Sequence, residues 1–307
     1  GAKGVNGDTR ETLCFNNCYW VYNLQTAAKI AEVLDDKEFA TKCRERAAAV
    51  RKAIHAEFFN ADDNGYVDDR QMYLAAALLA NVMPKDKKAD VWDRFEKEIT
   101  VDREGHVHAG ITGGYFLTKA LLDFGRPDLL YQMATKEDYP GWGYMLKNDA
   151  TTIWEDWEGQ KSQLHSSYLW VGWWYMAGLA GIQPWDVAPG FKSFYIDPGY
   201  YGTEGLNRVD AHFDSIHGRI ESHWRVEDGR FKLDVVIPPN TEAHVYIPTD
   251  DPNTVAEGDT VGIEALEKTH CAKIFYNHGK AMLLHVRSGH YHFETPAPSR
   301  EPQKPLL

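Results

Sequence analysis

A turn-rich segment between Tyr139 and His165 combines aromatic rings with carboxylates at close spacing. It contains YPGWGY at residues 139–144 and TTIWEDWE at residues 151–158. Aromatic rings stack on the apolar faces of sugars, polar groups bond to sugar hydroxyls, and a carboxylate can act on a glycosidic bond. The segment is therefore a candidate carbohydrate site, and Glu155, which lies between two tryptophans, is the candidate for its chemistry.

The aromatic side chains of this segment have a functional and a structural interpretation. Trp142 and Trp154 are candidate stacking platforms for a sugar ring, and core packing is the alternative for both. Tyr144 and Trp157 divide evenly between these two roles. Because Trp142 lies between two glycines, we expect a turn that displays its ring toward a cavity, so that its loss weakens sugar binding and leaves stability nearly unchanged.

The polar side chains divide in the same way. Glu155 is the candidate catalytic carboxylate, with a structural salt bridge as its alternative, and salt bridges are the favoured roles of Asp156 and Glu158. His165 stands at the start of a predicted helix, so the residues alone indicate a helix-capping histidine. The serines that follow it lack the context of a nucleophile elbow, and serine hydrolysis is not supported.

Composition and charge argue against other classes of protein. The chain has 307 residues and a net charge of −12, and its basic residues form no cluster, so a nucleic-acid partner is not expected. The longest uncharged stretch, residues 168–183, is shorter than the roughly 20 residues that span a bilayer, so no membrane span is expected. The ten tryptophans and sixteen tyrosines favour an aromatic-lined carbohydrate pocket.

No metal or cofactor site is predicted. Cys14 and Cys18 are four residues apart on a predicted helix without nearby histidines, and Cys43 and Cys271 are distant. This spacing favours simple packing over a metal site or a disulfide framework. Two histidines alternate along a predicted strand at residues 290–294, but a third ligand is missing.

The hydrophobic pattern predicts two parts of different fold class. Residues up to about 182 are mostly helical, and short polar turns join successive helices into antiparallel hairpins. Beyond Pro184 apolar residues take every second position, which predicts an antiparallel β-sandwich. We therefore divide the chain into residues 1–184 and 185–307, with the proline-rich end after Pro296 as an extended strap or a loose end. Two helices are expected between a cap at Asp8 and Phe58, and further helices at about 70–82, 86–99, 111–124, 127–135 and 165–181. Strands are expected at 220–226, 231–237, 243–247, 273–276, 281–287 and 290–294.

Several of these segments make the chain resemble the α-L-rhamnosidases of glycoside hydrolase family 78. The resemblance covers nearly the whole chain and is densest from residue 139 to 248. The matching segments are YPGWGYM at 139–145, ATTIWEDW at 150–157, SQLH at 162–165, LAGI at 179–182, APGF at 188–191, GRIESHW at 218–224 and IPPNT at 237–241.

The resemblance implies a fold and a reaction. The family fold is an (α/α)6 toroid of helical hairpins followed by a β-sandwich, and the family hydrolyses α-L-rhamnosides with inversion. A rhamnose-containing glycoside or polysaccharide is then the expected substrate, Glu155 is the base that activates water, and His165 contacts the sugar. Leu164 stands where the family usually has Asn, which leaves the fine substrate preference open.

The resemblance also implies that part of the protein is missing from this chain. About seven helices are predicted where the toroid has twelve, and no segment matches the family's general acid or several of its rhamnose-binding acids, which come earlier in the sequence. Together with a first residue, Gly1, that is not Met, this predicts an excised fragment that is inactive alone and whose partner is the missing N-terminal part. We favour a periplasmic or extracellular location, and a homodimer is compatible with the sequence.

Two alternatives to a hydrolase stay open. A sugar phosphorylase on a related toroid would need an anion site near Glu155, and Lys161 is the nearby cation. A non-catalytic carbohydrate-binding protein would retain the aromatic residues and lack the general acid.

Overall fold

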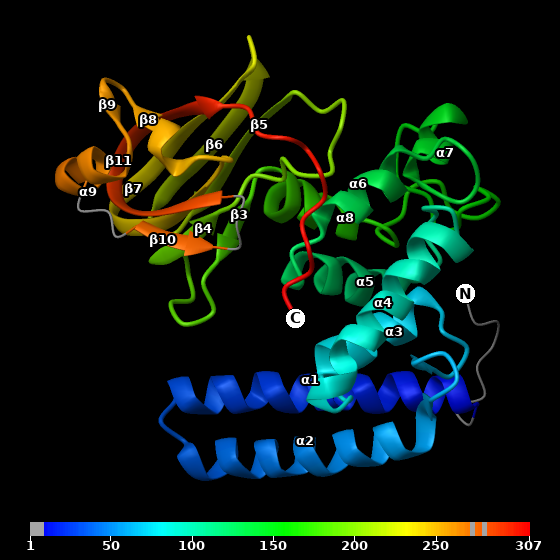
Figure 1. Ribbon diagram of the computed structural model, residues 1–307. Coiled ribbons are helices and arrows are strands. Elements are labelled where there is room, and N and C mark those ends of the chain that lie inside the picture. Colours follow the sequence, from blue (N-terminus) through cyan, green and yellow to red (C-terminus); the bar gives the residue numbers. More distant parts are fainter. Residues whose placement is uncertain (1–8, 271–273, 278–280) are drawn as a thin grey trace. The chain divides into compact units, whose positions relative to one another are not determined.

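The computed structural model in Figure 1 describes residues 9–270, 274–277 and 281–307, with side chains described at 9–268 and 281–307. The chain divides into two compact units. Unit 1 comprises Gly1–Phe124, Gln132–Trp170 and Leu306–Leu307, and unit 2 comprises Gly125–Tyr131 and Val171–Pro305. The domain boundary between residues 184 and 185 stays a prediction.

Unit 1 is helical, and most of its helices lie where the apolar spacing predicts them. Side chains cap two of the helix starts: Thr9 accepts a hydrogen bond from the Thr12 amide at 3.3 Å, and Asp36 accepts one from Phe39 at 3.0 Å. The predicted cap, Asp8, lies outside the described residues. The helices are α1 (Arg10–Val33), α2 (Lys37–Phe58), α3 (Gln71–Ala80), α4 (Lys88–Lys97), α5 (Ile111–Asp123), α6 (Pro127–Thr135), whose residues divide between the units, and α7 (Trp142–Lys147), with a 3-10 turn at Lys85–Lys87 and a π-helical turn at Glu98–Asp102.

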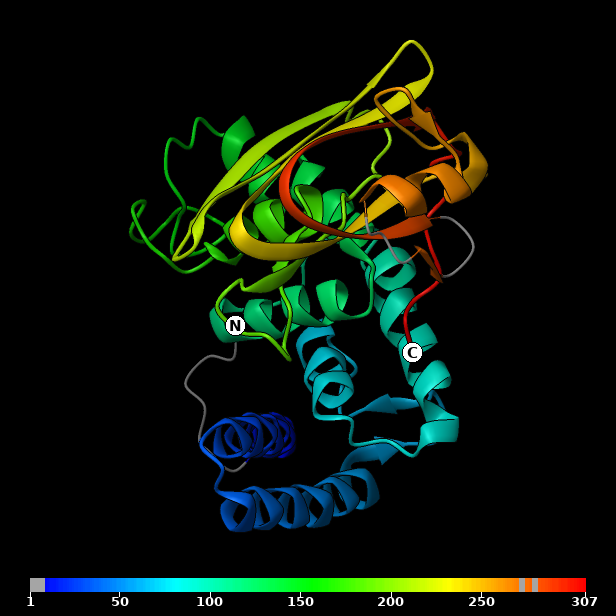
Figure 2. The same cartoon turned by 90° about the vertical axis from the view of Figure 1, so that its left-hand side faces the viewer.

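Helices α1 and α2 form a hairpin and lie side by side, as the end-on view in Figure 2 shows. Small buried residues, among them Cys14 and Cys18 of α1 and Cys43 and Ala47 of α2, allow the two helices to approach closely. The three described cysteines are free thiols, which agrees with the predicted packing role.

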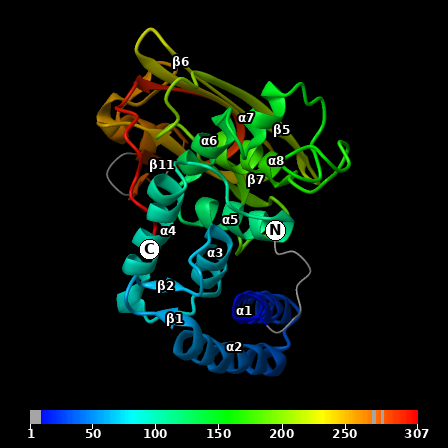
Figure 3. The same cartoon turned by 90° about the vertical axis from the view of Figure 1, so that its right-hand side faces the viewer.

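A short β-hairpin connects the first helical pair to the rest of unit 1. Strands β1 (Phe59–Asn60) and β2 (Gly65–Tyr66) pair antiparallel between α2 and α3 (Figure 3). Beyond them, Phe15 of α1 packs edge-on against Phe116 of α5, with ring centroids 5.1 Å apart. This contact joins α1 to the helices that precede the candidate site.

The single helix predicted at residues 165–181 is wrong. Residues 165–169 form turns, α8 covers only Trp170–Trp174, and a π-helical turn follows at Tyr175–Leu179. The first turns depart from a helix because Ser167 bonds to the His165 ring instead of to the preceding backbone. The π turn is closed by the Ala180 amide, which donates to the Tyr175 carbonyl at 3.0 Å.

Unit 2 contains a nine-stranded, mostly antiparallel sheet in which two long strands bend. The prediction of separate strands at 231–237 and 243–247 is wrong, because β7 continues through Pro238 and Pro239 and bends where Asn240 takes a φ of 61°. Likewise β11 is continuous, with a register shift between Arg287 and Gly289. The strands are β3 (Ile182–Pro184), β4 (Ser193–Ile196), β5 (Arg208–Ser215), β6 (Gly218–Glu227), β7 (Arg230–Pro248), β8 (Ala256–Glu257), β9 (Thr260–Val261), β10 (Ile274–Asn277) and β11 (Ala281–Pro296), with a 3-10 turn at Pro252–Thr254 and helix α9 at Ile263–His270.

The two bends fold this sheet into two layers. The first half of β7 pairs with β6 and with the second half of β11, whereas its second half pairs with β4 and with the first half of β11. Leu233 and Val235 from one half, and Val245 and Ile247 from the other, are buried in the same core. The strong curvature is visible in Figure 2. Unit 2 is therefore a β-sandwich made from one bent sheet, which agrees with the predicted fold class.

The chain end after β11 is an extended strap on unit 2. The Tyr200 hydroxyl donates to the Pro298 carbonyl at 2.6 Å, and Arg300 donates to the carbonyls of Thr203 and Leu206 at 2.7 Å each. Of the two predicted possibilities, the strap is confirmed.

Candidate active site

The predicted site segment folds as an irregular hairpin in unit 1. The Glu155 amide donates to the Ser162 carbonyl at 2.8 Å, and the His165 amide donates to the Ile153 carbonyl at 2.9 Å. At its tip the Asp156 carboxylate accepts a hydrogen bond from the Gln160 amide at 3.0 Å. Through these bonds Glu155 and His165, ten positions apart, stand on the two arms of one hairpin.

The Glu155 carboxylate is only lightly held by its neighbours. One oxygen accepts a long hydrogen bond from the Ser162 amide at 3.4 Å, and the other lies 3.8 Å from the Lys161 ammonium. The side chain is 32% exposed, and that of Lys161 is 64% exposed. An exposed ion pair at this distance is weak, so the carboxylate keeps the capacity to accept a proton from water.

His165 is exposed and has its tautomer set by Ser167. Its Nδ1 accepts a hydrogen bond from the Ser167 amide at 3.0 Å and is also paired with the Ser167 hydroxyl. The neutral ring then carries its proton on Nε2, which is a donor suited to a sugar hydroxyl. Since residues 165–169 are turns, the helix-capping role suggested by the residues alone is wrong, and sugar contact stays a prediction.

Trp157 of the hairpin and three aromatic side chains from the neighbouring segments form what we term the ring cluster: Trp142, Trp157, Tyr168 and Trp170. Trp157 stacks on Tyr168 at 3.8 Å and 19°, and Trp142 packs edge-on against Trp157 at 5.2 Å and against Trp170 at 4.6 Å. The Trp142 indole also donates to the Tyr168 carbonyl at 3.2 Å. The cluster ties both ends of the segment together.

The ring cluster changes the interpretation of Trp142 and Trp157. Trp142 is the first residue of α7 and not part of an open turn, and it is only 5% exposed. Trp157 is 8% exposed. Burial of this degree favours the core-packing alternative for both rings, and their stacking against sugar stays a prediction.

Trp154 is also buried, under the tip of the hairpin. Gly159 takes a φ of +69°, and a Cβ at this position would lie 2.8 Å from the Trp154 ring. Only glycine therefore lets the tip fold over this indole. The side chain of the neighbouring Glu155 differs from this ring in being partly exposed to solvent.

Tyr144 is half-buried at the edge of the segment and packs edge-on against Tyr139 at 5.5 Å. The Tyr139 hydroxyl donates to Glu158 at 2.7 Å. Burial and this carboxylate raise the pKa of Tyr139 to about 12. Glu158 is therefore held by a neutral phenol. The salt bridges predicted for Glu158 and Asp156 are wrong for the described residues, because Asp156 accepts instead from a backbone amide.

Tyr168 is the site residue that sequence reasoning missed. Its ring holds Trp157 and its carbonyl holds Trp142, yet nothing in the sequence relates it to the motif 11 residues earlier. Its position shortly after the motif gave no periodic signal, because the surrounding residues form turns. The contact is visible only in three dimensions.

Within the described part of the chain, no group of three or more His, Cys, Asp or Glu residues is arranged to hold a metal ion. The described helices also include none long and apolar enough to cross a membrane.

The geometry above lies within a region that matches a known family. Residues 2–179 match the bacterial α-L-rhamnosidase six-hairpin glycosidase domain, which is more than half of the chain. The chain belongs to this family. Residues 181–262 match the bacterial α-L-rhamnosidase C-terminal domain, so the helical unit and the sandwich both agree with the predicted fold class and resemblance.

Curated relatives are named α-L-rhamnosidases, and they are much longer than this chain. An α-L-rhamnosidase of Formosa agariphila is 28% identical over 302 residues, which cover 94% of this chain and 31% of the relative. One of Streptomyces avermitilis is 29% identical over 248 residues, covering 77% of this chain and 23% of the relative. The chain thus spans less than a third of the length of these relatives.

Solved structures show the same fold. The α-L-rhamnosidase of Streptomyces avermitilis complexed with L-rhamnose is similar with a TM-score of 0.79 and 26% identity, over 91% of this chain and 26% of that chain. The α-L-rhamnosidase of Dictyoglumus thermophilum has a TM-score of 0.81 and 25% identity, over 91% and 31%.

Proposed function

We propose that this protein is an α-L-rhamnosidase in which Glu155 activates the attacking water and the anomeric configuration is inverted. Glu155 lies in the part of the chain that matches the α-L-rhamnosidase six-hairpin domain. The observation that carries the proposal is that its carboxylate is partly exposed and only weakly paired. The rings beside it are buried and the neighbouring Glu158 is bonded to Tyr139.

In an inverting glycosidase two carboxyl groups lie roughly 6.5–9.5 Å apart on opposite faces of the scissile bond. The ionised one removes a proton from water as water attacks the anomeric carbon, and the protonated one delivers its proton to the leaving oxygen. We assign the first role to Glu155. We assign the acid to a part of the protein outside this chain, as the resemblance implies.

His165 supports this assignment as the group that orients the sugar. It stands on the hairpin arm opposite Glu155, and its Nε2–H is a donor whose direction is fixed by the bonds at Nδ1. A rhamnose hydroxyl held there would place the anomeric carbon relative to Glu155. A rhamnose-containing glycoside or polysaccharide is accordingly the proposed substrate.

The test uses the full-length protein and an aryl α-L-rhamnoside. Glu155→Gln should lower kcat by about 10²–10⁴-fold, because a general base contributes this much, while the variant folds normally. Glu158→Gln is the matched control, three residues away on the same loop, and should keep most of the activity. Proton NMR of the first-formed sugar should show β-L-rhamnose. Near-normal turnover by Glu155→Gln, or α-L-rhamnose as first product, would contradict the proposal.

The Lys161 ammonium, 3.8 Å from Glu155, is the observation that favours the second candidate, phosphorolysis. In a phosphorylase an anion would take the place of the attacking water. Release of rhamnose 1-phosphate that depends on added phosphate would support this alternative, whereas free rhamnose at the same rate without phosphate supports hydrolysis.

A further inference from the structure

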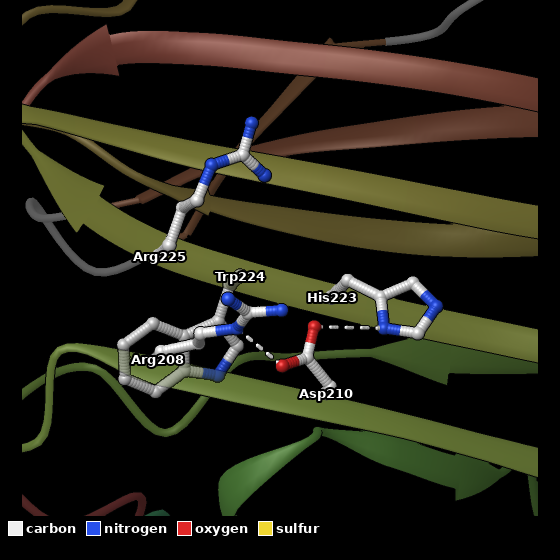
Figure 4. A pocket seen from close by; sticks show the side chains of 5 residues that line it. All are labelled: Arg208, Asp210, His223, Trp224 and Arg225. Atoms are coloured by element: carbon white, nitrogen blue, oxygen red, sulfur yellow. Dashed lines mark hydrogen bonds and ion pairs between the residues drawn. The ribbon is translucent and has the colours of Figure 1, made fainter.

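A pocket lies on the outer face of the sandwich, within unit 2 and away from the motif segment in the sequence. It has a volume of about 160 Å³ and is lined by residues of β5 and β6: Arg208, Asp210, His223, Trp224 and Arg225 (Figure 4). One ordered water needs ~10–15 Å³ of such space, so the pocket has room for a group of several atoms, such as one sugar residue.

Strand register determines the polar lining of this pocket. Arg208 lies directly opposite Arg225, and Asp210 lies directly opposite His223, in the antiparallel β5–β6 pair. Directly opposite residues project from the same face of a sheet, so the four side chains stand on one face and form what we term the polar box. Arg208, Asp210 and His223 lie together in it, whereas the Arg225 guanidinium extends away from them (Figure 4). Trp224, between His223 and Arg225 in the sequence, turns its ring to the core and is 1% exposed.

Two arginines that face each other across a strand pair repel, unless each has its own counter-charge. Arg208 is paired with Asp210, and Arg225 donates to Asp234 of β7 at 2.6 Å. The Arg208 guanidinium also lowers the pKa of Asp210, which keeps that carboxylate ionised. Glu227 also lies 3.7 Å from Arg225, and Glu221 lies 3.2 Å from His223. Both arginines therefore have carboxylate partners, and such a wall suits a neutral ligand better than an anion.

The box also has unused hydrogen-bonding capacity. A guanidinium has five N–H donors, and a single carboxylate occupies at most two of them. One Asp210 oxygen lies 3.3 Å from His223 Nδ1 in an ion-pair contact whose geometry is not that of a hydrogen bond. That oxygen can therefore accept a hydrogen bond from a ligand. Donors and an acceptor next to each other match the vicinal hydroxyls of a sugar, each of which can donate and accept.

We propose that this pocket is a subsite for a neutral saccharide, whose hydroxyls donate to Asp210 and accept from Arg208 and Arg225. The inference rests on the proposed function only in taking a saccharide as the ligand. The subsite would bind a part of an extended substrate other than the residue being cleaved. A small aryl glycoside carries a single sugar residue, so its hydrolysis would not depend on the subsite.

The test measures binding and turnover separately in the full-length protein. In a Glu155→Gln background, calorimetry with a neutral rhamnan oligosaccharide should show affinity about three- to tenfold lower for Arg208→Gln and Asp210→Asn, the loss of one or two neutral-ligand hydrogen bonds. Arg208 is 71% exposed in its side chain, so its replacement should not affect folding. With Glu155 intact, both variants should hydrolyse an aryl α-L-rhamnoside as the parent does.

Arg219→Gln is the matched control. Arg219 is paired with Asp214 at 2.8 Å across the same two strands, and it does not line the pocket. Its variant should bind the oligosaccharide normally. Unchanged affinity in the pocket variants, an equal loss in Arg219→Gln, or tighter binding of a uronate or sulfated oligosaccharide than of the neutral one would each overturn the proposal. A protein that hydrolyses no rhamnoside would refute the proposed function, and the binding isotherms would still decide on the subsite.

Discussion

The hairpin around Glu155 and the β5–β6 pair both present charged side chains, but they hold them in different ways. In the sheet, continuous backbone pairing from Arg208↔Arg225 to Ser215↔Gly218 sets every position. In the hairpin, two backbone bonds and the ring cluster set the position of Glu155. A side chain on the sheet can therefore be changed alone, whereas a ring of the cluster cannot be changed without moving the site.

This difference indicates that the tryptophans of the motif support the hairpin from the core. Their types suggest sugar stacking, yet the tryptophans at 142, 154 and 157 are buried, and beside them the carboxylate of Glu155 is partly exposed. We infer that the rings act mainly by fixing the geometry of the carboxylate. Substitutions in the ring cluster should then reduce stability first and activity as a consequence.

The largest effect on stability is expected from Trp142→Ala. The ring is 5% exposed, contacts two other indoles and donates a hydrogen bond, and the loss of a buried aromatic side chain costs about 3–5 kcal/mol. Thermal unfolding of the full-length variant should show a lower Tm, while Arg219→Gln on the sheet should leave Tm nearly unchanged. An unchanged Tm together with weaker rhamnose binding would restore the platform role that the sequence suggests.

A smaller effect should appear at alkaline pH through Tyr168. Burial, and then the charges of Asp156 and Glu158, raise the pKa of Tyr168 to about 12, against about 10 when unfolded. The neutral phenol therefore stabilises the fold fully below pH 10, and this contribution of about 1–3 kcal/mol is lost as pH rises from 10 to 12. Urea unfolding across this range should show a shallower decline for Tyr168→Phe than for the parent. Parallel declines would place Tyr168 in a more open environment.

The smallest effect is expected from Lys161→Gln. The ammonium is 64% exposed and 3.8 Å from Glu155, and exposed pairs contribute about 0–1 kcal/mol. The value of kcat/KM for an aryl rhamnoside should change by no more than about threefold, and the difference should shrink at high salt. A loss of a hundredfold would mean that Lys161 takes part in the reaction, and would favour the phosphorylase alternative.

Local patterns predicted the regular elements well. Apolar spacing placed α3, α5 and α6 within two residues of their observed bounds, and alternation located β6. These elements depend on neighbours three, four or two positions away, which the sequence displays directly. The continuity of β7 through two prolines was missed, because prolines usually end a strand and here the bend moves them out of the regular ladder.

The sequence predicted which segment contains the candidate site but not how its side chains are arranged in space. The sequence brought Glu155, His165 and the aromatic residues together because they lie close along the chain. It could not show that Trp142 begins a helix, that Tyr168 stacks on Trp157, or that Trp170 lies against Gly114, where a Cβ would be 2.1 Å from the indole. Those contacts depend on how turns orient each ring, and turns leave no periodic pattern.

The most direct test of the role of Glu155 is azide rescue of Glu155→Ala in the full-length protein. In the proposed mechanism, removal of the carboxylate leaves space beside the anomeric carbon, where azide needs no base to attack. The C–N bond forms as the bond to the aryl oxygen breaks, and the aryl group leaves as the phenol, because the general acid donates its proton to that oxygen. The account predicts slow hydrolysis by the variant alone and azide-dependent formation of β-L-rhamnosyl azide. Hydrolysis near the parent rate without azide, or α-L-rhamnosyl azide as the product, would contradict it.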